Sequence, residues 1–354
     1  MSQPDFDQPF VIGRIDTPVG PIAKVSASLQ MSDHLGTIKA RLGIGRMHYT
    51  VDPGLYAVGT PDSSSHVIVT ANYKLTFDAL RSELYGRNLW ILVVDTDGIN
   101  VWCAAGKGSF SVNEVARRIQ YTGLDRIVIH RRVILPQLSA PGVAAHELKK
   151  LSGFNGVFGP IRAGDLPGFL DAGLEATPDM RTKKFPVWER IELIPIEFVS
   201  GFKLVALLSL FFLVITGFRG TGSFFENIMN DGLLVVTVLF GALLAGSVLT
   251  PILLPWLPVK AFSLKGVLAS LFILAALCLV NLGHGVSMDQ FLANIAPWCL
   301  MVPALAAFLA MNFTGCSTFT SLSGVKKEMK FAAPAEAAAF ALGAITWLTL
   351  PFIQ

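Results

Sequence analysis

The chain of 354 residues has little charge for its length. Charged residues make up only 15% of it, whereas 52% are hydrophobic and the mean hydropathy is +0.56. This balance excludes an ordinary soluble protein and indicates a domain joined to a membrane part. Residues 1–199 carry 21 Lys and Arg against 20 Asp and Glu, and residues 200–354 carry 7 against 5. Neither part is basic enough to indicate nucleic-acid binding.

Cysteine is scarce, with four residues in total. Cys278, Cys299 and Cys316 lie in or beside the apolar C-terminal stretches, which leaves Cys103 as the one cysteine of residues 1–199. A disulfide framework or a C-x-x-C site is therefore excluded there. An iron–sulfur cluster needs about four thiolates, so we expect no cluster in this chain. The C-terminal cysteines are expected to be packing residues, with a thiol relay for a soft metal such as mercury as the alternative.

A secretory signal is also missing. Residues 1–25 contain Asp5, Asp7 and four prolines and have no apolar core, so we expect residues 1–199 to stay in the cytoplasm. The first thirty or so residues are punctuated by Pro, Gly and Ser, which predicts an irregular arm.

Long apolar runs fill the C-terminal part. Five of them are near the length that spans roughly 30 Å of hydrocarbon, at residues 202–218, 233–254, 264–282, 291–311 and 331–353. If residues 1–199 are inside, the outer loops carry only Arg219, while the inner loops carry Lys260, Lys265, Lys326, Lys327 and Lys330. The positive-inside rule then predicts a multi-pass protein of the cytoplasmic (inner) membrane with its C-terminus outside.

Polar residues in these runs are few. Glu336 and Lys203 are expected to lie near helix ends, where long side chains reach the interface, and His284 is expected in an outer loop. No ion path is evident, which disfavours a transporter.

The N-terminal part alternates β-rich and helical patterns. Strands are predicted at 66–71, 89–95, 126–134 and 157–159, and helices at 75–85, 112–121, 141–151 and 165–170. Ser111 with Glu114 is a capping-box signal for the second of these helices. The alternation predicts a three-layer, Rossmann-like α/β domain with a largely parallel sheet over residues 1–199, followed by an all-α transmembrane domain over residues 200–354.

The stretch Gly98–Gly108 follows a predicted buried strand and contains Cys103. We expect Cys103 in a strand-to-helix loop at the carboxyl end of the sheet, where ligands bind. A nearby helix N-terminus and Lys107 would favour a thiolate there, so Cys103 is a candidate soft metal ligand. The plainer alternative is a small buried hydrophobe. A phosphate loop is excluded, because Val101 and Gly108 stand where its first Gly and its Ser or Thr are required.

Residues 100–107, NVWCAAGK, resemble the signature of the mercury-methylating corrinoid proteins, which are membrane-bound partners of a small ferredoxin, at every position. Residues 43–47, 53–59, 69–76, 134–138 and 140–147 resemble the same family, so the resemblance covers most of the first 200 residues. More distantly, this part is similar to the corrinoid-binding domain of the corrinoid iron–sulfur protein of acetyl-CoA synthesis.

This resemblance implies a corrinoid cofactor, cobalamin or a related cobamide, with the Cys103 thiolate as the lower axial ligand of cobalt. None of the six histidines stands in the D-x-H-x-x-G motif that supplies this ligand in many corrinoid proteins. The implied reaction is methyl transfer from cobalt to Hg(II), giving methylmercury. The anionic sulfur would favour departure of the methyl group as a carbanion equivalent. The implied partners are a low-potential ferredoxin-type iron–sulfur protein and a methyl-donor corrinoid methyltransferase.

The candidate corrinoid-binding residues are the signature itself and two polar residues at the end of the strand at 66–71: Thr70, Asn72, Asn100, Val101, Trp102, Cys103, Ala104, Ala105, Gly106 and Lys107. Trp102 is equally compatible with a core role, and Thr70 and Asn100 with turn formation. His146 and Glu147 are expected on a helix surface, with a contact to the cofactor tail or the methyl donor as the alternative. Two other functions stay open, namely a different methyl acceptor and a cobamide-binding module without turnover.

Overall fold

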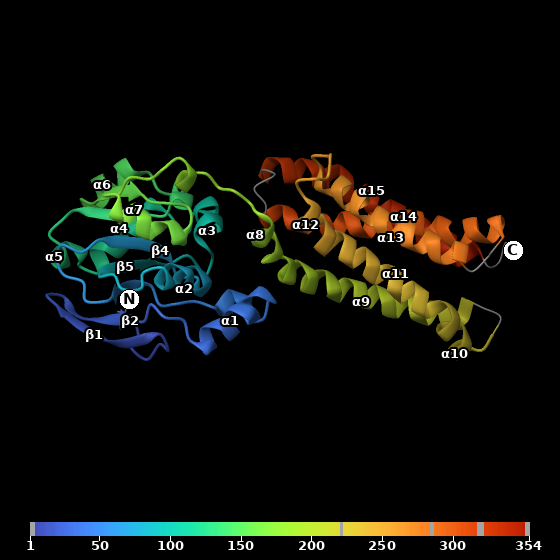
Figure 1. The fold of residues 1–354 in the computed structure, drawn as a ribbon, viewed down its shortest axis with the longest axis horizontal. Coiled ribbons are helices and arrows are strands. Elements are labelled where there is room, and N and C mark those ends of the chain that lie inside the picture. The colour runs from blue at the N-terminus through green and yellow to red at the C-terminus, as the bar shows by residue number, and fades with distance from the viewer. Residues whose placement is uncertain (1–3, 220–221, 284–286, 317–321, 351–354) are drawn as a thin grey trace. The chain divides into compact units, whose positions relative to one another are not determined.

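The computed structural model describes residues 4–219, 222–283, 287–316 and 322–350, without the side chains of residues 315, 316 and 322. The chain forms two compact units (Figure 1). The first comprises residues 1–40 and 44–184, and the second comprises residues 41–43 and 185–354.

The first unit contains a seven-stranded sheet in the order β1-β2-β3-β5-β4-β6-β7. The strands are β1 (Val11–Thr17), β2 (Gly20–Val25), β3 (Gly54–Val58), β4 (Val67–Ala71), β5 (Leu89–Val94), β6 (Arg132–Leu135) and β7 (Asn155–Phe158). Among these seven strands, only the β1–β2 and β3–β5 pairs are antiparallel. The prediction of a largely parallel sheet is therefore confirmed.

Helices cover both faces of this sheet (Figure 1). Leu92 and Val94 of β5 belong to a core shared with α3, α4 and α6, whereas Ile91 and Val93 belong to a core shared with α2 and α7. Burial on both faces explains why β5 is an unbroken apolar run. The helices of this unit are α1 (Met31–Arg41), α2 (Lys74–Ser82), α3 (Val101–Lys107), α4 (Val112–Tyr121), α5 (Leu124–Ile127), α6 (Ala145–Ser152) and α7 (Leu166–Asp171), and short 3-10 turns include η1 (Arg46–His48) and η2 (Gln137–Ser139).

Two predictions for this unit are wrong. The expected irregular arm is the hairpin β1–β2, whose turn uses Gly20 at φ 109° and whose Ile22, Ala23 and Val25 enter the core. The expected strand over 126–134 is mostly the short helix α5 and a loop, and β6 begins only at Arg132. Gly123, at φ 60°, lets the chain start α5, a conformation that residues with a Cβ rarely adopt.

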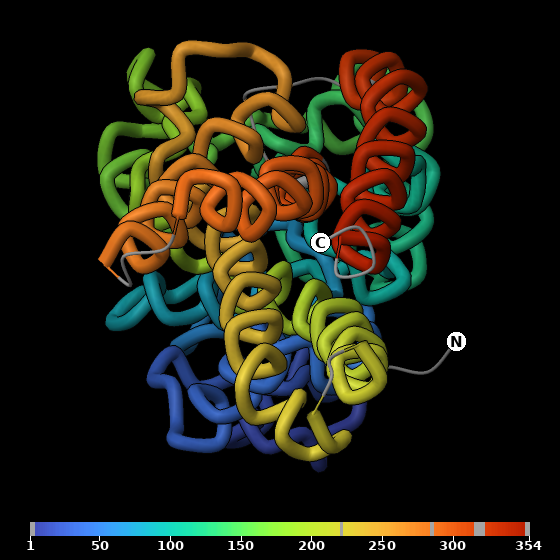
Figure 2. The backbone as a smooth tube through the Cα atoms, turned by 90° about the vertical axis from the view of Figure 1, so that its right-hand side faces the viewer, coloured from blue at the N-terminus to red at the C-terminus, as the bar shows by residue number. Residues whose placement is uncertain are grey.

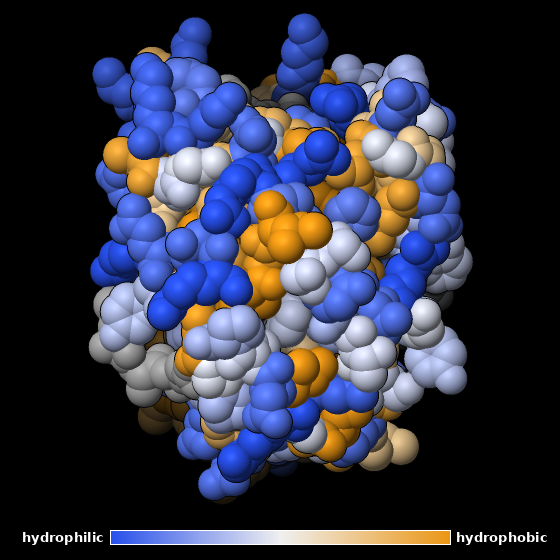
Figure 3. All heavy atoms as spheres, turned by 90° about the vertical axis from the view of Figure 1, so that its left-hand side faces the viewer, coloured by the Kyte–Doolittle hydropathy of each residue, from blue (hydrophilic) through white to orange (hydrophobic). Residues whose placement is uncertain are grey.

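The outer face of the first unit that Figure 3 shows is mainly hydrophilic, with isolated apolar side chains. A shallow hollow at the amino-terminal edge of the parallel strands is lined by the β1–β2 turn and by residues 61–63 and 125–131. Scattered exposed apolar residues of this kind are normal for a protein surface.

Among its described residues, the second unit has five helices long and apolar enough to cross a membrane, at Val187–Arg219, Phe224–Leu253, Phe262–Gly283, Met288–Asn312 and Ser323–Thr349. Figure 2 views this unit from its end. The prediction of five long apolar helices is confirmed, although residues 351–353 of the last predicted span lie outside the described residues. Their elements are α8 (Val187–Ile191), α9 (Ile194–Arg219), α10 (Phe224–Asn227), α11 (Leu233–Leu244), α12 (Thr250–Leu253), α13 (Phe262–Gly283), α14 (Met288–Asn312) and α15 (Leu322–Thr349), with π-helical turns at Ile228–Gly232 and Ala245–Leu249.

Two buried cations donate hydrogen bonds to backbone carbonyls at the C-terminal end of α12. The Lys265 ammonium donates to the carbonyl of Leu254 at 2.6 Å, and the Arg190 guanidinium donates to the carbonyl of Pro251 at 2.8 Å. Terminal carbonyls of a helix have no partner within it, so cations are favourable there. Lys265 thus lies inside α13, and not in an inner loop as expected.

Glu336 also differs from its prediction. It lies within α15, is 9% exposed, and neither carboxylate oxygen has a hydrogen-bond partner among the described residues. A carboxyl group buried between helices cannot reach the interface, so the expectation of a snorkelling side chain is wrong. Lys203 is exposed but lies in the middle of the span Val187–Arg219, so its expected place near a helix end is also wrong, and His284 lies outside the described residues.

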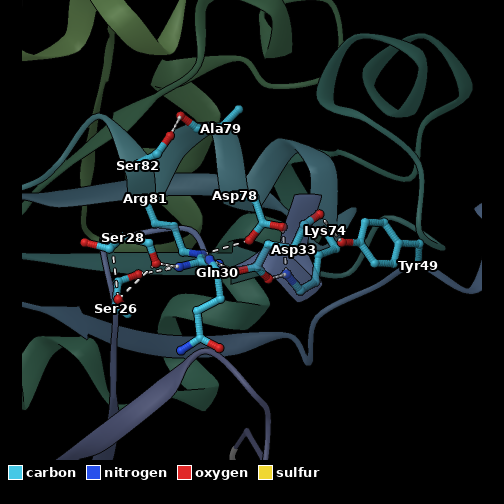
Figure 4. A network of polar contacts seen from close by, with 10 residues as sticks. All are labelled: Ser26, Ser28, Gln30, Asp33, Tyr49, Lys74, Asp78, Ala79, Arg81 and Ser82. Atoms are coloured by element: carbon cyan, nitrogen blue, oxygen red, sulfur yellow. Dashed lines mark hydrogen bonds and ion pairs between the residues drawn. The ribbon is translucent and has the colours of Figure 1, made fainter. Parts of the chain in front are cut away.

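A buried cluster of four charged residues holds α1 to the first unit (Figure 4). The Lys74 ammonium lies 2.6 Å from carboxylate oxygens of both Asp33 and Asp78. The Arg81 guanidinium lies 2.8 Å from the same two carboxylates and donates to the carbonyl oxygens at Ser26 and Ser28. Two cations and two anions cancel, which is the condition under which burial of charge is tolerated.

Ionised Asp33 stabilises this cluster. Burial of the carboxyl group opposes ionisation, but hydrogen bonds from Lys74, the backbone of Gln30 and Arg81 outweigh it and lower the pKa of Asp33 from 3.8 to about 2. Because the pKa is lower in the folded state, the contribution to stability is present above about pH 4 and is lost as the pH falls through about 2.

We expect Asp33→Asn to destabilise the first unit by about 3 to 5 kcal/mol, because it leaves two buried cations with one carboxylate. The measurement is amide hydrogen exchange of β4 and β5 in the full chain at neutral pH. Asp171→Asn is the matched control, since it removes a carboxylate from an exposed ion pair with Arg87. Equal exchange in the two variants would contradict the stabilising role of the cluster.

Candidate functional site

The carboxyl ends of β4, β5 and β6 lie at one edge of the sheet, because these strands are parallel neighbours. Asn72 follows β4 and is buried. Its side-chain oxygen accepts hydrogen bonds from the backbone N–H groups of Thr96 and Gly98, both at 3.1 Å, and its amide donates to the Asp95 carboxylate at 3.2 Å. One side chain after β4 therefore holds the loop that follows β5.

That loop leads directly into α3, so Cys103 lies in a helix and not in the expected loop. Asn100 is the N-cap residue of α3, and its side-chain oxygen accepts a hydrogen bond from the Cys103 N–H at 2.9 Å. Gly108 ends the helix at φ 89°. The sequence contained both cap signals, but only seven residues separate the caps, too few for a clear helical period.

The two faces of α3 divide the candidate residues. Val101, Ala104 and Ala105 are buried in the core against the sheet. Trp102 is 39% exposed, Cys103 is half-buried, and Gly106 and Lys107 are exposed. The cysteine thus lies in the first helical turn, between the buried and the exposed face of α3.

The segments that carry the resemblance meet around this helix. A Cβ on Gly142 would lie 2.1 Å from the Phe110 carbonyl oxygen and 3.1 Å from the Ala105 Cα, so only glycine allows that approach. A Cβ on Gly98 would lie 2.7 Å from the Thr50 Cγ2. In addition, η2 after β6 packs against α3. These contacts bring together residues 46–50, 98–110 and 137–142 at the carboxyl edge of the sheet.

The predicted cap of α4 is confirmed in part. The Ser111 hydroxyl accepts the Glu114 N–H at 3.3 Å, as expected for an N-cap. The Glu114 carboxylate, however, accepts the Asp95 N–H at 3.0 Å and is paired with Arg117 and Arg118. It thus ties α4 to the loop before α3.

The remaining candidates are Thr70, His146 and Glu147. Thr70 is buried within β4. His146 and Glu147 are both exposed on α6, and their Nε2 and Oε1 atoms are 4.0 Å apart. Both residues therefore lie on a helix surface, as expected.

Two polar atoms at this edge were not anticipated. The Gln137 Oε1 in η2 and the Ser109 Oγ after α3 are buried and have no hydrogen-bond partner within the described chain. Gln137 belonged to a stretch noted for its resemblance, but nothing in its neighbours predicted that its oxygen would be buried without a donor. Such an atom is costly unless a ligand or water supplies one.

These residues fit a corrinoid. In the part of the chain that the structure describes, no three His, Cys, Asp or Glu side chains gather at metal-ligand spacing. Cys103 has one sulfur to offer to a metal, and the other ligands of a corrinoid's cobalt come from the macrocycle itself. A Cβ on Gly106, one helical turn on, would meet no atom within 4 Å, which leaves space beside the sulfur. The buried Gln137 oxygen can accept a hydrogen bond from an amide on the rim of the cofactor.

The first unit contains the residues that match a known protein family. Residues 34–170 match the family model described as CO dehydrogenase/acetyl-CoA synthase delta subunit. The acetyl-CoA decarbonylase/synthase complex subunit gamma 2 of Methanosarcina thermophila is 35% identical over 130 residues, which are 36% of this chain and 27% of the relative. The subunits gamma of Methanopyrus kandleri and Methanocaldococcus jannaschii are 32% and 38% identical, over 34% and 27% of this chain and 26% and 20% of their own length.

The chain thus spans only 20% to 27% of the length of these relatives. The matched residues run from α1 to α7 and include the whole edge around Cys103. This agrees with the expected distant similarity to a protein of acetyl-CoA synthesis. The chain is similar to these complex subunits over its first unit.

Proposed function

We propose that this chain is a membrane-anchored corrinoid protein that transfers a methyl group from cobalt to Hg(II), giving methylmercury. The observation that carries the proposal is the position of Cys103, in the first turn of α3 at the ligand-binding edge of a parallel sheet. The residues around it are those that resemble the mercury-methylating family. The similarity to acetyl-CoA decarbonylase/synthase subunits supports the coarser part of the proposal, a corrinoid-binding first unit.

A bound corrinoid would supply a methyl group carried on cobalt. Cys103 would hold the cobalt through its sulfur, and as a thiolate would donate electron density to it. Asn100 holds the helical turn that presents this sulfur. Hg(II) is an electrophile, which suits a methyl group that leaves with its bonding electrons.

Other signature residues would bind or shape the site. Trp102 offers an exposed aromatic face beside the sulfur, and Lys107 an exposed ammonium one turn later. Val101, Ala104 and Ala105 would act from within the core by fixing α3 on the sheet. Thr70 and Asn72 would act in the same indirect way, since both are buried.

In this proposal residues 1–199 are the corrinoid-binding domain and residues 200–354 the membrane domain. The chain would hold no iron–sulfur cluster of its own, since Cys103 is the one cysteine of residues 1–199. A low-potential ferredoxin-type protein would supply electrons, and a corrinoid methyltransferase the methyl group. The first unit would lie in the cytoplasm and the C-terminus outside.

We expect Cys103→Ala to keep the fold, because the side chain is only half-buried and its loss opens no core cavity. The variant should change the cobalt spectrum and lose most methylmercury yield. Cys103→Ser should fail almost as badly, because a hydroxyl is a poor ligand for cobalt. The measurement is the visible spectrum of the bound corrinoid beside methylmercury yield at equal protein level.

Cys278→Ala and Cys299→Ala are the matched controls, and both should keep the spectrum and the yield. An unchanged spectrum and normal yield in Cys103→Ala would disprove the ligand assignment. Cobamide binding without any methylmercury from the unmutated chain would instead indicate a binding module or another acceptor.

Sustained turnover should require an iron–sulfur protein. After each transfer of a methyl carbanion equivalent, regeneration of Co(I) needs two electrons, and this chain has too few cysteines near Cys103 to hold a cluster. The test is repeated turnover with a methyl donor and a reductant too weak to reach Co(I), with and without a reduced ferredoxin. Many turnovers without the ferredoxin would argue against this partner.

The C-terminus should lie outside the cytoplasm, because five spans place the ends on opposite sides and lysines gather at the expected inner side. Lys260 precedes α13, Lys265 lies in its first turn, and Lys326, Lys327 and Lys330 lie in the first turns of α15 and not in the loop before it, as the sequence had indicated. Alkaline phosphatase fused after Gln354 should be active, and a fluorescent protein that folds only in the cytoplasm should be dark. The reverse pattern would overturn the orientation.

A further inference from the structure

Helix α1 presents its large apolar side chains to solvent. Met31, Leu35 and Ile38 recur at helical spacing on one face and are 73%, 52% and 54% exposed. The opposite, inward face carries Asp33, which is buried, and Gly36, whose Cβ position lies 2.2 Å from the Tyr49 hydroxyl. A surface helix normally has the reverse arrangement, with its apolar stripe toward the core.

The buried charge cluster makes this arrangement possible. Asp33 anchors α1 through Lys74 and Arg81, as Figure 4 shows, so the helix does not need apolar burial to stay in place. The apolar stripe of Met31, Leu35 and Ile38 is therefore left for another surface. Exposed apolar surface of this kind typically marks an interaction site.

The charges beside the stripe indicate what kind of surface the stripe would contact. Within residues 31–50 the one acidic residue is Asp33, and its charge is neutralised inside the cluster. Lys39 is exposed next to the stripe, and Arg46 and the exposed Ile44 and Met47 follow. Apolar residues bordered by basic side chains are the pattern of a helix that lies on an anionic bilayer.

We propose that the stripe of α1 docks on the anionic surface of the bilayer in which the apolar helices of the same chain lie. Covalent attachment to those helices keeps this surface at a high effective concentration, so a short stripe is sufficient. Docking would also hold the edge around α3 near the lipid, since Met47 lies beside Gly98. The inference does not depend on the methyl acceptor.

The test is amide hydrogen exchange of residues 31–41 in the full chain, in nanodiscs of phosphatidylglycerol with phosphatidylethanolamine and in nanodiscs of phosphatidylcholine. We expect exchange about tenfold slower in the anionic lipid, because docking suppresses local opening of α1. Leu35→Gln and Ile38→Gln should abolish the difference, and Lys39→Glu or high salt should reduce it. Glutamine is chosen because it is a good helix former.

Ile129→Gln is the control, because Ile129 is 76% exposed elsewhere on the first unit. It should leave the lipid effect unchanged, and exchange of α2 in every variant reports whether the unit is folded. Equal exchange of α1 in both lipids would overturn the proposal. So would protection that depends on protein concentration, which indicates a second copy, or on an added iron–sulfur protein, which indicates a protein partner.

Discussion

The candidate site depends on one buried amide. Asn72 accepts hydrogen bonds from the backbone of Thr96 and Gly98 and donates to Asp95, and it thereby joins the ends of β4 and β5. The chain then turns through Asp97 and Gly98, both at positive φ, and reaches Asn100 in position to cap α3. The direction in which Cys103 points follows from where α3 begins. A substitution of Asn72 would thus alter the direction of the Cys103 side chain, although the two residues are joined only through the loop.

Two different interactions stabilise the first unit, one around the sheet and one at α1. Around the sheet, apolar side chains from both helical layers bury β4 and β5 completely. At α1, a neutral set of four buried charges replaces that packing. Hydrophobic burial is non-directional, whereas ion pairs require defined geometry, so the cluster sets one orientation of α1. The apolar residues of that helix can then serve a surface outside the unit.

The second unit shows how polar groups are accommodated among apolar helices. Asn294 donates to Asn281 at 3.1 Å, which joins α14 to α13, and Lys265 and Arg190 satisfy carbonyls at the end of α12. Glu336 lies within α15 with no partner in the described chain. Hydrogen bonds between helices are favoured where water is absent. A carboxyl group without one is an exception, and no role for it emerges from its surroundings.

Much was determined by the sequence by itself. The unbroken apolar run of β5, the Ser111 cap of α4 and the five long apolar stretches depend on local periodicity and composition, which is why they were predictable. The scarcity of cysteine left Cys103 as the one cysteine of residues 1–199, and its position after a predicted strand made it a candidate ligand. The resemblance of residues 100–107 then supplied the chemistry, which no pattern of polarity could do.

Tertiary structure decided the rest. The helical state of residues 101–107 depends on a loop held from β4, and the hairpin at residues 11–25 depends on a place in the sheet beside β3. The burial of Glu336 and the neutral cluster around Asp33 depend on which helices become neighbours. Such features arise from contacts between segments distant in the chain, so no local pattern contains them. For the same reason, the outward apolar face of α1 became visible only once its inward face was known.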